Sequence, residues 1–106
     1  MSFRIHKWDE VPEKEMTPLL SRKVIWGKNQ NLALFHLKKG CHLPAHQHVS
    51  EQFSYILQGA LRFVIDGNEV TVTKGEVIHL PSNIIHEAYA LEDTYDLDVF
   101  SPIRDS

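Results

Sequence analysis

Two of the seven histidines in this 106-residue chain, His46 and His48, are separated by a single residue. Neutral imidazole is the commonest protein ligand of transition metals. On an extended strand, residues i and i+2 point to one face with Cα atoms about 6.6 Å apart, so two imidazoles can converge on one ion. Pro44, just before the pair, favours extended backbone. The pair alone is also typical of an exposed polar strand face.

The other histidines lie in less informative surroundings. We expect His6 and His36 at the surface, because the first belongs to the N-terminal segment and the second alternates with Leu37 on an ordinary strand. His42 precedes the pair and is expected at the rim of a pocket. His79 is interpreted as a packed, hydrogen-bonded histidine.

Short apolar runs, separated by regularly spaced glycines and prolines, occupy most of the chain. This rhythm predicts many short strands and therefore an all-β sandwich or barrel. The clearest hairpin joins residues 61–65 to residues 69–73, because the intervening Asp66 and Gly67 suit the positive φ angles of a tight turn. Further strands are expected at residues 23–26, 32–37, 53–57, 77–80, 84–91 and 95–100.

Residues 1–20 carry no convincing helical period, because Pro12 and Pro18 interrupt the nearest candidate segment. We expect an N-terminal arm laid over a barrel that begins at about residue 20, with Trp8 as its apolar anchor. Residues 53–57 are apolar at both parities, which indicates a strand covered on both faces. A second subunit in a homodimer, or the arm itself, would cover the outer face.

Length and composition limit the class of protein. A chain of 106 residues forms one domain. Because so small a domain buries a limited core, we expect additional stabilisation from a bound metal or from a homodimer. The net charge is −3 and the 11 Lys and Arg residues are scattered, which argues against nucleic-acid binding. No apolar run resembles a membrane span or a signal peptide. Because the single cysteine, Cys41, excludes an internal disulfide, we expect a reduced, cytoplasmic protein.

Two segments resemble the conserved motifs of the cupin superfamily. The first motif has Gly, five residues, His-x-His, three or four residues, Glu, six residues and Gly; here the corresponding positions are Gly40, His46, His48, Gln52 and Gly59. The second has Gly, five residues, Pro-x-Gly, two residues and His; here these are Gly75, Pro81, Asn83 and His86. The resemblance covers residues 20–106. It implies a cupin-type double-stranded β-helix, or jelly-roll barrel, with His86 as a third metal ligand.

The chain departs from these motifs at two positions. Asn83 replaces a glycine, a mild change because Asn tolerates left-handed backbone. Gln52 stands at the glutamate position, while the acidic Glu51 lies one residue out of register. Because a one-residue slip turns a side chain to the other face of a strand, the resemblance implies Gln52 as the fourth ligand and Glu51 outside. The alternative is that Glu51 binds the metal through a bulge while Gln52 only hydrogen-bonds nearby.

The implied ligand set, His46, His48, Gln52 and His86, brings no negative charge to a divalent ion. Such an ion would keep its full charge and polarise a bound oxygen strongly, which suits a Lewis acid better than oxygen activation. We expect one divalent metal ion, with zinc, nickel, iron and manganese as candidates.

The last predicted strand places Asp96, Asp98 and Phe100 on one face, which by itself is typical of a solvent-exposed face. The segment from Asp98 to Arg104 resembles the tail of the KdgF-like, uronate-ketonising cupins of pectin degradation, which also use three histidines and a glutamine for metal. In them the residues that match Asp98, Phe100 and Arg104 line the pocket. The resemblance implies that Asp98 moves a proton, Arg104 binds the substrate carboxylate and Phe100 shapes the wall.

Three functions fit this sequence, because one fold hosts many reactions. The favoured function is a metal-dependent isomerase or ketonising enzyme that acts on a small, carboxylated, sugar-derived substrate of the unsaturated-uronate type. The first alternative is a metal-dependent dioxygenase, an oxidoreductase. The second is a non-catalytic cupin that binds a small ligand and uses the metal as a structural clip.

Overall fold

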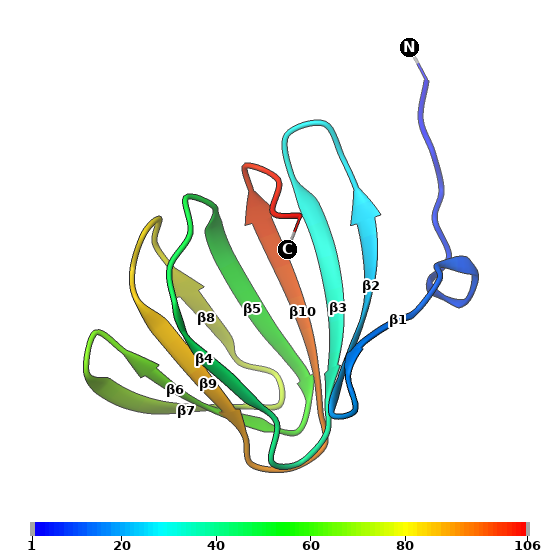
Figure 1. Ribbon diagram of the computed structural model, residues 1–106. Coiled ribbons are helices and arrows are strands. Elements are labelled where there is room, and N and C mark those ends of the chain that lie inside the picture. Colours follow the sequence, from blue (N-terminus) through cyan, green and yellow to red (C-terminus); the bar gives the residue numbers. More distant parts are fainter. Residues whose placement is uncertain (1, 106) are drawn as a thin grey trace.

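The computed structural model describes residues 2–105, which form two antiparallel sheets arranged as a jelly roll (Figure 1). The larger sheet has the strand order β1-β2-β3-β10-β5-β8, and the smaller one has the order β4-β9-β6-β7. The predicted all-β fold class is therefore confirmed. The strands are β1 (Lys14–Thr17), β2 (Leu20–Trp26), β3 (Asn31–Leu37), β4 (His42–His46), β5 (Glu51–Gln58), β6 (Ala60–Ile65), β7 (Asn68–Thr73), β8 (Val77–Leu80), β9 (His86–Ala90) and β10 (Thr94–Ser101).

The space between the two sheets is filled by two kinds of side chain. One part is an apolar core that includes Leu37, Ile56, Leu61 and Leu80, all of which are at most 1% exposed. The other part is polar, because several inward-facing positions of the same strands are occupied by polar residues. Its buried members are Asn31, Gln52, Ser54, His86, Asp96 and Asp98.

The N-terminal segment differs from the expected arm. Strand β1 lies within it and pairs with β2, with Lys14 opposite Arg22. All four residues of β1 are exposed. An edge strand held by main-chain pairing needs no apolar residues, which is why the apolar pattern did not reveal it. Residues 2–6 extend away from the sheets (Figure 1). Trp8 lies in a short 3-10 turn, Trp8–Glu10, that buries no side chain, and its carbonyl oxygen accepts a hydrogen bond from Lys23 Nζ of β2 at 2.9 Å.

Two turns show why particular residue types occupy their positions. Asp66 and Gly67 connect β6 to β7 with φ angles of 49° and 84°, as predicted for a tight hairpin. Asn83 adopts a φ of 66°, the left-handed conformation that Asn tolerates. Its backbone N–H donates to the carbonyl oxygen of His48 at 2.8 Å. This hydrogen bond ties the loop before His86 to the loop that carries His48, so it brings the two motif segments together.

Gly59 allows the chain to cross from the larger sheet to the smaller one. Its φ is +95°, and a Cβ atom there would lie 2.4 Å from Thr94 Oγ1 and 2.5 Å from the carbonyl oxygen of Asp93. We expect Gly59→Ala to lower the free energy of unfolding by about 2–4 kcal/mol, because it adds a clash to an unfavourable backbone conformation. Urea unfolding measures this change.

Gly75→Ala is the matched control for this prediction. Gly75 has a similar φ of +87°, but a Cβ atom there would meet nothing within 4 Å. It should cost about 1 kcal/mol, the penalty of the backbone conformation alone. Equal losses in the two variants would show that close packing at Gly59 contributes nothing.

Candidate functional site

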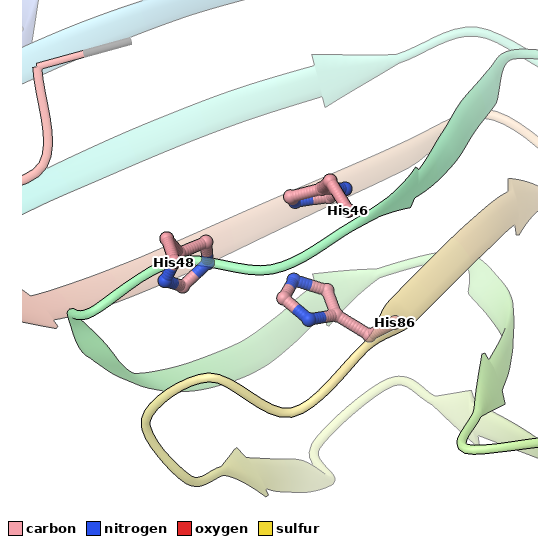
Figure 2. Close-up of side chains that lie close together, drawn as sticks. All are labelled: His46, His48 and His86. Atoms are coloured by element: carbon pink, nitrogen blue, oxygen red, sulfur yellow. The ribbon is translucent and has the colours of Figure 1, made fainter.

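Three histidines from the two motif segments meet at one end of the interior. His46 is the last residue of β4 and lies opposite His86, the first residue of β9, while His48 lies in the loop after β4. The ligand nitrogens of the three residues all lie within 4.8 Å of one another. Figure 2 shows the three rings directed toward a common point. The expectation that His46 and His48 share one strand face is wrong, because β4 ends before His48; the loop supplies the convergence instead.

The backbone orients each of the three rings in the same way. The Nδ1 atoms of His46, His48 and His86 lie 2.8, 2.8 and 2.9 Å from the carbonyl oxygens of Pro44, Ser50 and Ile84. A carbonyl oxygen only accepts, so each Nδ1 carries the proton and each Nε2 keeps its lone pair. Fixing the tautomer in this way is the usual preparation of a histidine for metal coordination.

Gln52 extends the cluster with a side-chain oxygen. Its amide nitrogen donates to Ser54 Oγ at 2.8 Å and to Asp98 Oδ2 at 3.2 Å. This orientation leaves Gln52 Oε1 at 3.0 Å from His48 Nε2. Both atoms present lone pairs, so they repel unless a cation lies beside them. The residues therefore fit a metal ion, for which a lone pair from each would be a ligand.

Gln52 and its neighbour Glu51 point to opposite faces of strand β5. Gln52 is 6% exposed on the inner face, whereas Glu51 is exposed on the outer face and hydrogen-bonded to His79 Nε2. Glu51 therefore lies on the face opposite the histidine cluster. Its predicted position outside the barrel agrees with the regular alternation of β5.

Burial keeps two of the histidines uncharged. Burial is the largest cause that lowers the pKa of His86, to about 4, and it also lowers the pKa of His48, with a further contribution from the positive charge of Arg104. Both imidazoles are therefore neutral at neutral pH. A neutral imidazole is the form that binds a metal ion.

A cavity of about 150 Å³ lies beside the histidine cluster, between the two sheets. Ala88 follows His86 on the same face of β9, and its small side chain leaves space that a larger residue would fill. Apolar side chains, among them Phe35, Leu43, Leu61 and Phe63, form much of the wall. Polar groups occupy the rest of it: His46, Gln52, His86, Asp96, Asp98, Arg22 and Arg104.

Asp98 and Asp96 give the cavity a pair of buried carboxyl groups. They are 5% and 4% exposed, and the Oδ1 atom of each has no hydrogen-bond partner among the described residues. Burial is the largest cause that raises the pKa of both groups, and the negative charge of Asp98 raises that of Asp96 further. The pair therefore holds a proton at a higher pH than exposed carboxyl groups would. The interpretation of this strand face as solvent-exposed is wrong, because Asp96 and Asp98 lie opposite the buried Ile56 and Ser54 of β5, on the face of the larger sheet that is turned inward.

Arg104 lies at the cavity and is held there through its backbone. The buried Asn31 accepts a hydrogen bond from the Arg104 N–H at 2.9 Å and donates one to its carbonyl oxygen at 3.3 Å. The guanidinium carbon lies 5.8 Å from the centre of the Phe100 ring, which also packs edge-on against His48. Asp98, Phe100 and Arg104 therefore lie in the same cavity as the histidine cluster.

Sequence reasoning misplaced one histidine and missed four polar residues of this region. His42 lies on the outer face of the smaller sheet, stacked on Tyr89 and hydrogen-bonded to Glu87, not at the pocket rim. Asp96 was expected on the same strand face as Asp98, but no role in the site was assigned to it. Ser54, Asn31 and Arg22 belong to no motif, and their positions depend on strand register.

The fold and the cavity define a small cupin barrel with a histidine cluster in its interior. Residues 33–101 match the model of the cupin domain family, so this chain belongs to that family. Among solved structures it is similar to KdgF from Halomonas sp., with 30% sequence identity, a TM-score of 0.86, and coverage of 98% of this chain and 97% of that one. An RmlC-like cupin from Shewanella frigidimarina has 22% identity, a TM-score of 0.90, and coverage of 98% and 95%.

One relative of known sequence is named as a dioxygenase. The chain is 27% identical over 101 residues to a 3-hydroxyanthranilate 3,4-dioxygenase of Bacillus thuringiensis (strain Al Hakam), with 91% of this chain covered. The match spans only 56% of that protein's length. Residues 2–105 include no helix long and apolar enough to cross a bilayer.

The histidine cluster leads to a prediction about stability. A metal that binds only the folded chain at about 100 times its Kd stabilises it by about 2.7 kcal/mol, which should raise the Tm of a domain of this size by roughly 10 °C. We expect Zn²⁺ added to chelator-treated protein to produce such a shift in a thermal melt, and His86→Ala to abolish it.

His79→Ala is the control, because His79 lies on the outer face of the larger sheet, stacked on Phe53. It should retain the zinc-dependent shift. A shift that survives His86→Ala and disappears in His79→Ala would place the metal outside the barrel.

Proposed function

We propose that this cupin is a metal-dependent enzyme that ketonises or isomerises a small unsaturated acid, such as an unsaturated uronate. The observation that carries the proposal is the position of Asp98. One of its carboxyl oxygens is fixed by Gln52, beside the histidine cluster, while Oδ1 lacks a partner in residues 2–105 and the side chain lines the cavity. The resemblance of residues 98–104 to the uronate-ketonising cupins supports the same assignment.

His46, His48, His86 and Gln52 are the proposed metal ligands. A divalent ion bound there would supply a positive charge that polarises an oxygen atom of the substrate. The ligands themselves contribute no negative charge, so they would leave that polarisation undiminished. Phe100 and the apolar wall limit the access of water to the same region.

Asp98 would transfer the proton. Ketonisation of an enol removes the proton of the enol oxygen and adds one to the carbon of the C=C bond that does not carry that oxygen, with no gain or loss of electrons. A carboxyl group with a raised pKa can donate a proton to that carbon and recover one from the oxygen side. Arg104, held at the cavity by Asn31, would bind the substrate carboxylate through its planar, charged N–H donors.

A metal-dependent dioxygenase is the second candidate, and the similarity to the Bacillus dioxygenase favours it. Oxygen activation would require a redox-active metal. The neutral ligand set and the buried proton-transferring carboxyl group instead favour acid–base chemistry at a polarised substrate. Turnover of an unsaturated uronate without consumption of oxygen separates the two candidates.

The outer face of the larger sheet supports the proposal of a homodimer. Apolar side chains of neighbouring strands lie there at least partly exposed, among them Leu34, Leu97, Phe53 and Tyr55. Of the N-terminal residues, Trp8 lies against this face at β2, where its carbonyl oxygen accepts a hydrogen bond from Lys23 Nζ at 2.9 Å. A second copy packed on the same face would bury these side chains in a two-fold interface.

Substitution of Asp98 tests the proposed reaction. Asp98→Asn keeps the shape of the side chain but cannot exchange a proton, so we expect the rate of uronate ketonisation to fall about 10²–10⁴-fold with metal content unchanged. Arg104→Ala should chiefly raise KM, because it removes a binding contact. Steady-state kinetics and metal analysis measure these effects.

Glu51→Gln is the control for Asp98→Asn, because it neutralises a carboxyl group on the outer face of the adjacent strand β5. Its kcat should match that of the unsubstituted protein. If Asp98→Asn retained full activity, the proposed acid–base role would be rejected.

The homodimer is tested by a charge placed on the apolar outer face. Leu97→Glu should convert a dimer to a monomer, since two buried carboxylates would face each other or lose their hydration across a two-fold interface. Light scattering coupled to gel filtration measures the mass. Thr71→Glu, on the exposed outer face of the smaller sheet, should leave the dimer intact. A monomeric unsubstituted protein would contradict the proposal.

A further inference from the structure

Arg22 lines the same cavity as Arg104, although no motif includes it. It lies in the middle of β2, directly opposite Phe35 of β3, whose side chain also lines the cavity. Antiparallel partners in register point to the same face of a sheet. The strand therefore directs the Arg22 side chain toward the interior side of the larger sheet.

Arg22 and Arg104 are close enough to influence each other. Burial lowers the pKa of Arg104, the charge of Asp98 raises it, and the charge of Arg22 lowers it. In the described part of the chain neither guanidinium forms an ion pair with a carboxylate. Two guanidinium groups at one cavity, neither of them paired directly with a carboxylate, repel each other, and a bound anion would relieve that repulsion.

The hydrogen bonding of Arg22 leaves most of its donors available. Its Nη2 atom donates to the carbonyl oxygen of Asp105 at 3.2 Å. Because Asp105 follows Arg104 in the chain, this hydrogen bond holds the C-terminal segment close to the Arg22 guanidinium. A guanidinium group has five N–H donors, and this is the one side-chain hydrogen bond of Arg22 within residues 2–105. Lys14 lies opposite Arg22 on β1 and adds a further positive charge to this edge of the sheet.

We propose that Arg22 and Arg104 together bind one carboxylate of the ligand, so that Arg22 is a specificity-determining residue for organic acids. Two guanidinium groups present more donors than a single carboxylate can use, so they can hold it from two directions. The inference rests on the proposed function for the reacting end of the ligand. It adds Arg22 as a second binding residue for the carboxylate of the ligand. It also predicts that the negative charge of the ligand, more than the shape of its ring, determines which ligand binds.

Paired probes that differ only in charge test this inference. The Kd values of D-galacturonate and pyruvate, and of the methyl ester of each, are measured by calorimetry on the metal-loaded, full-length protein. The unsubstituted protein should bind each acid more tightly than its ester. Arg22→Gln should raise the Kd of both acids about tenfold or more, because it removes a charge-assisted contact, and should leave both esters unchanged.

Three variants make the test specific. Arg22→Lys keeps the charge but loses the planar donors, so it should weaken acid binding less than Arg22→Gln. Lys23→Gln removes a positive charge from the next residue of β2 and should change no Kd. Because both arginines would hold one carboxylate, the effects of Arg22→Gln and Arg104→Gln should not be additive in the double variant.

Several outcomes would overturn the inference. Equal weakening of acids and esters by Arg22→Gln would mean that Arg22 only fastens the C-terminal segment. Equal affinity of the unsubstituted protein for acids and esters, no binding of any acid, or tighter binding of inorganic phosphate would exclude a carboxylate site. Acid binding that depends on Arg22, without ketonisation of an unsaturated uronate, would support this inference and contradict the proposed function.

Discussion

The side-chain amide of Gln52 connects the two chemical halves of the interior. Its nitrogen is occupied by Ser54 and Asp98, so its oxygen must face His48. A carboxylate at this position could not donate to Asp98, and it would add a negative charge beside a buried carboxyl pair. The amide therefore allows the histidine cluster and an acidic pair to share one small cavity. The proposed metal binding and the proposed proton transfer both depend on this orientation.

Hydrogen bonds to the backbone or from Asn31 hold these groups in place, including His48 and Arg104, which lie outside the strands. Backbone carbonyls fix the tautomers of the three histidines, and Asn31 fixes the backbone of Arg104. Arg22 lies on β2, toward the other edge of the larger sheet from Gln52 on β5, whereas Arg104 follows β10 and is close enough to influence the pKa of His48 and of Asp98. A ligand in the cavity would then meet the proposed polarising and proton-transferring groups together with the two guanidinium groups.

Much of this arrangement could be predicted from the sequence where a local pattern determines it. The Asp66–Gly67 turn is of this kind. The positions of Gln52 and His86 beside His46 were instead implied by the resemblance to the two cupin motifs. The role of β1 was hidden because edge pairing needs no apolar pattern. The position of Arg22 was hidden because it depends on the register of β2 against β3, which no single segment encodes. The inward position of Asp96 and Asp98 depends on which face of β10 is turned toward the smaller sheet, and the alternation of β10 alone does not determine that.

The central claim is that His46, His48, His86 and Gln52 bind one metal ion. Anomalous X-ray diffraction from crystals of metal-loaded protein, collected at the absorption edge of the bound metal, tests it most directly. The account predicts one strong peak roughly 2.0–2.3 Å from the Nε2 atoms of the three histidines, with Gln52 Oε1 as the fourth protein ligand. A peak beside Glu51 and His79 on the outer face, or none between the histidines, would contradict it.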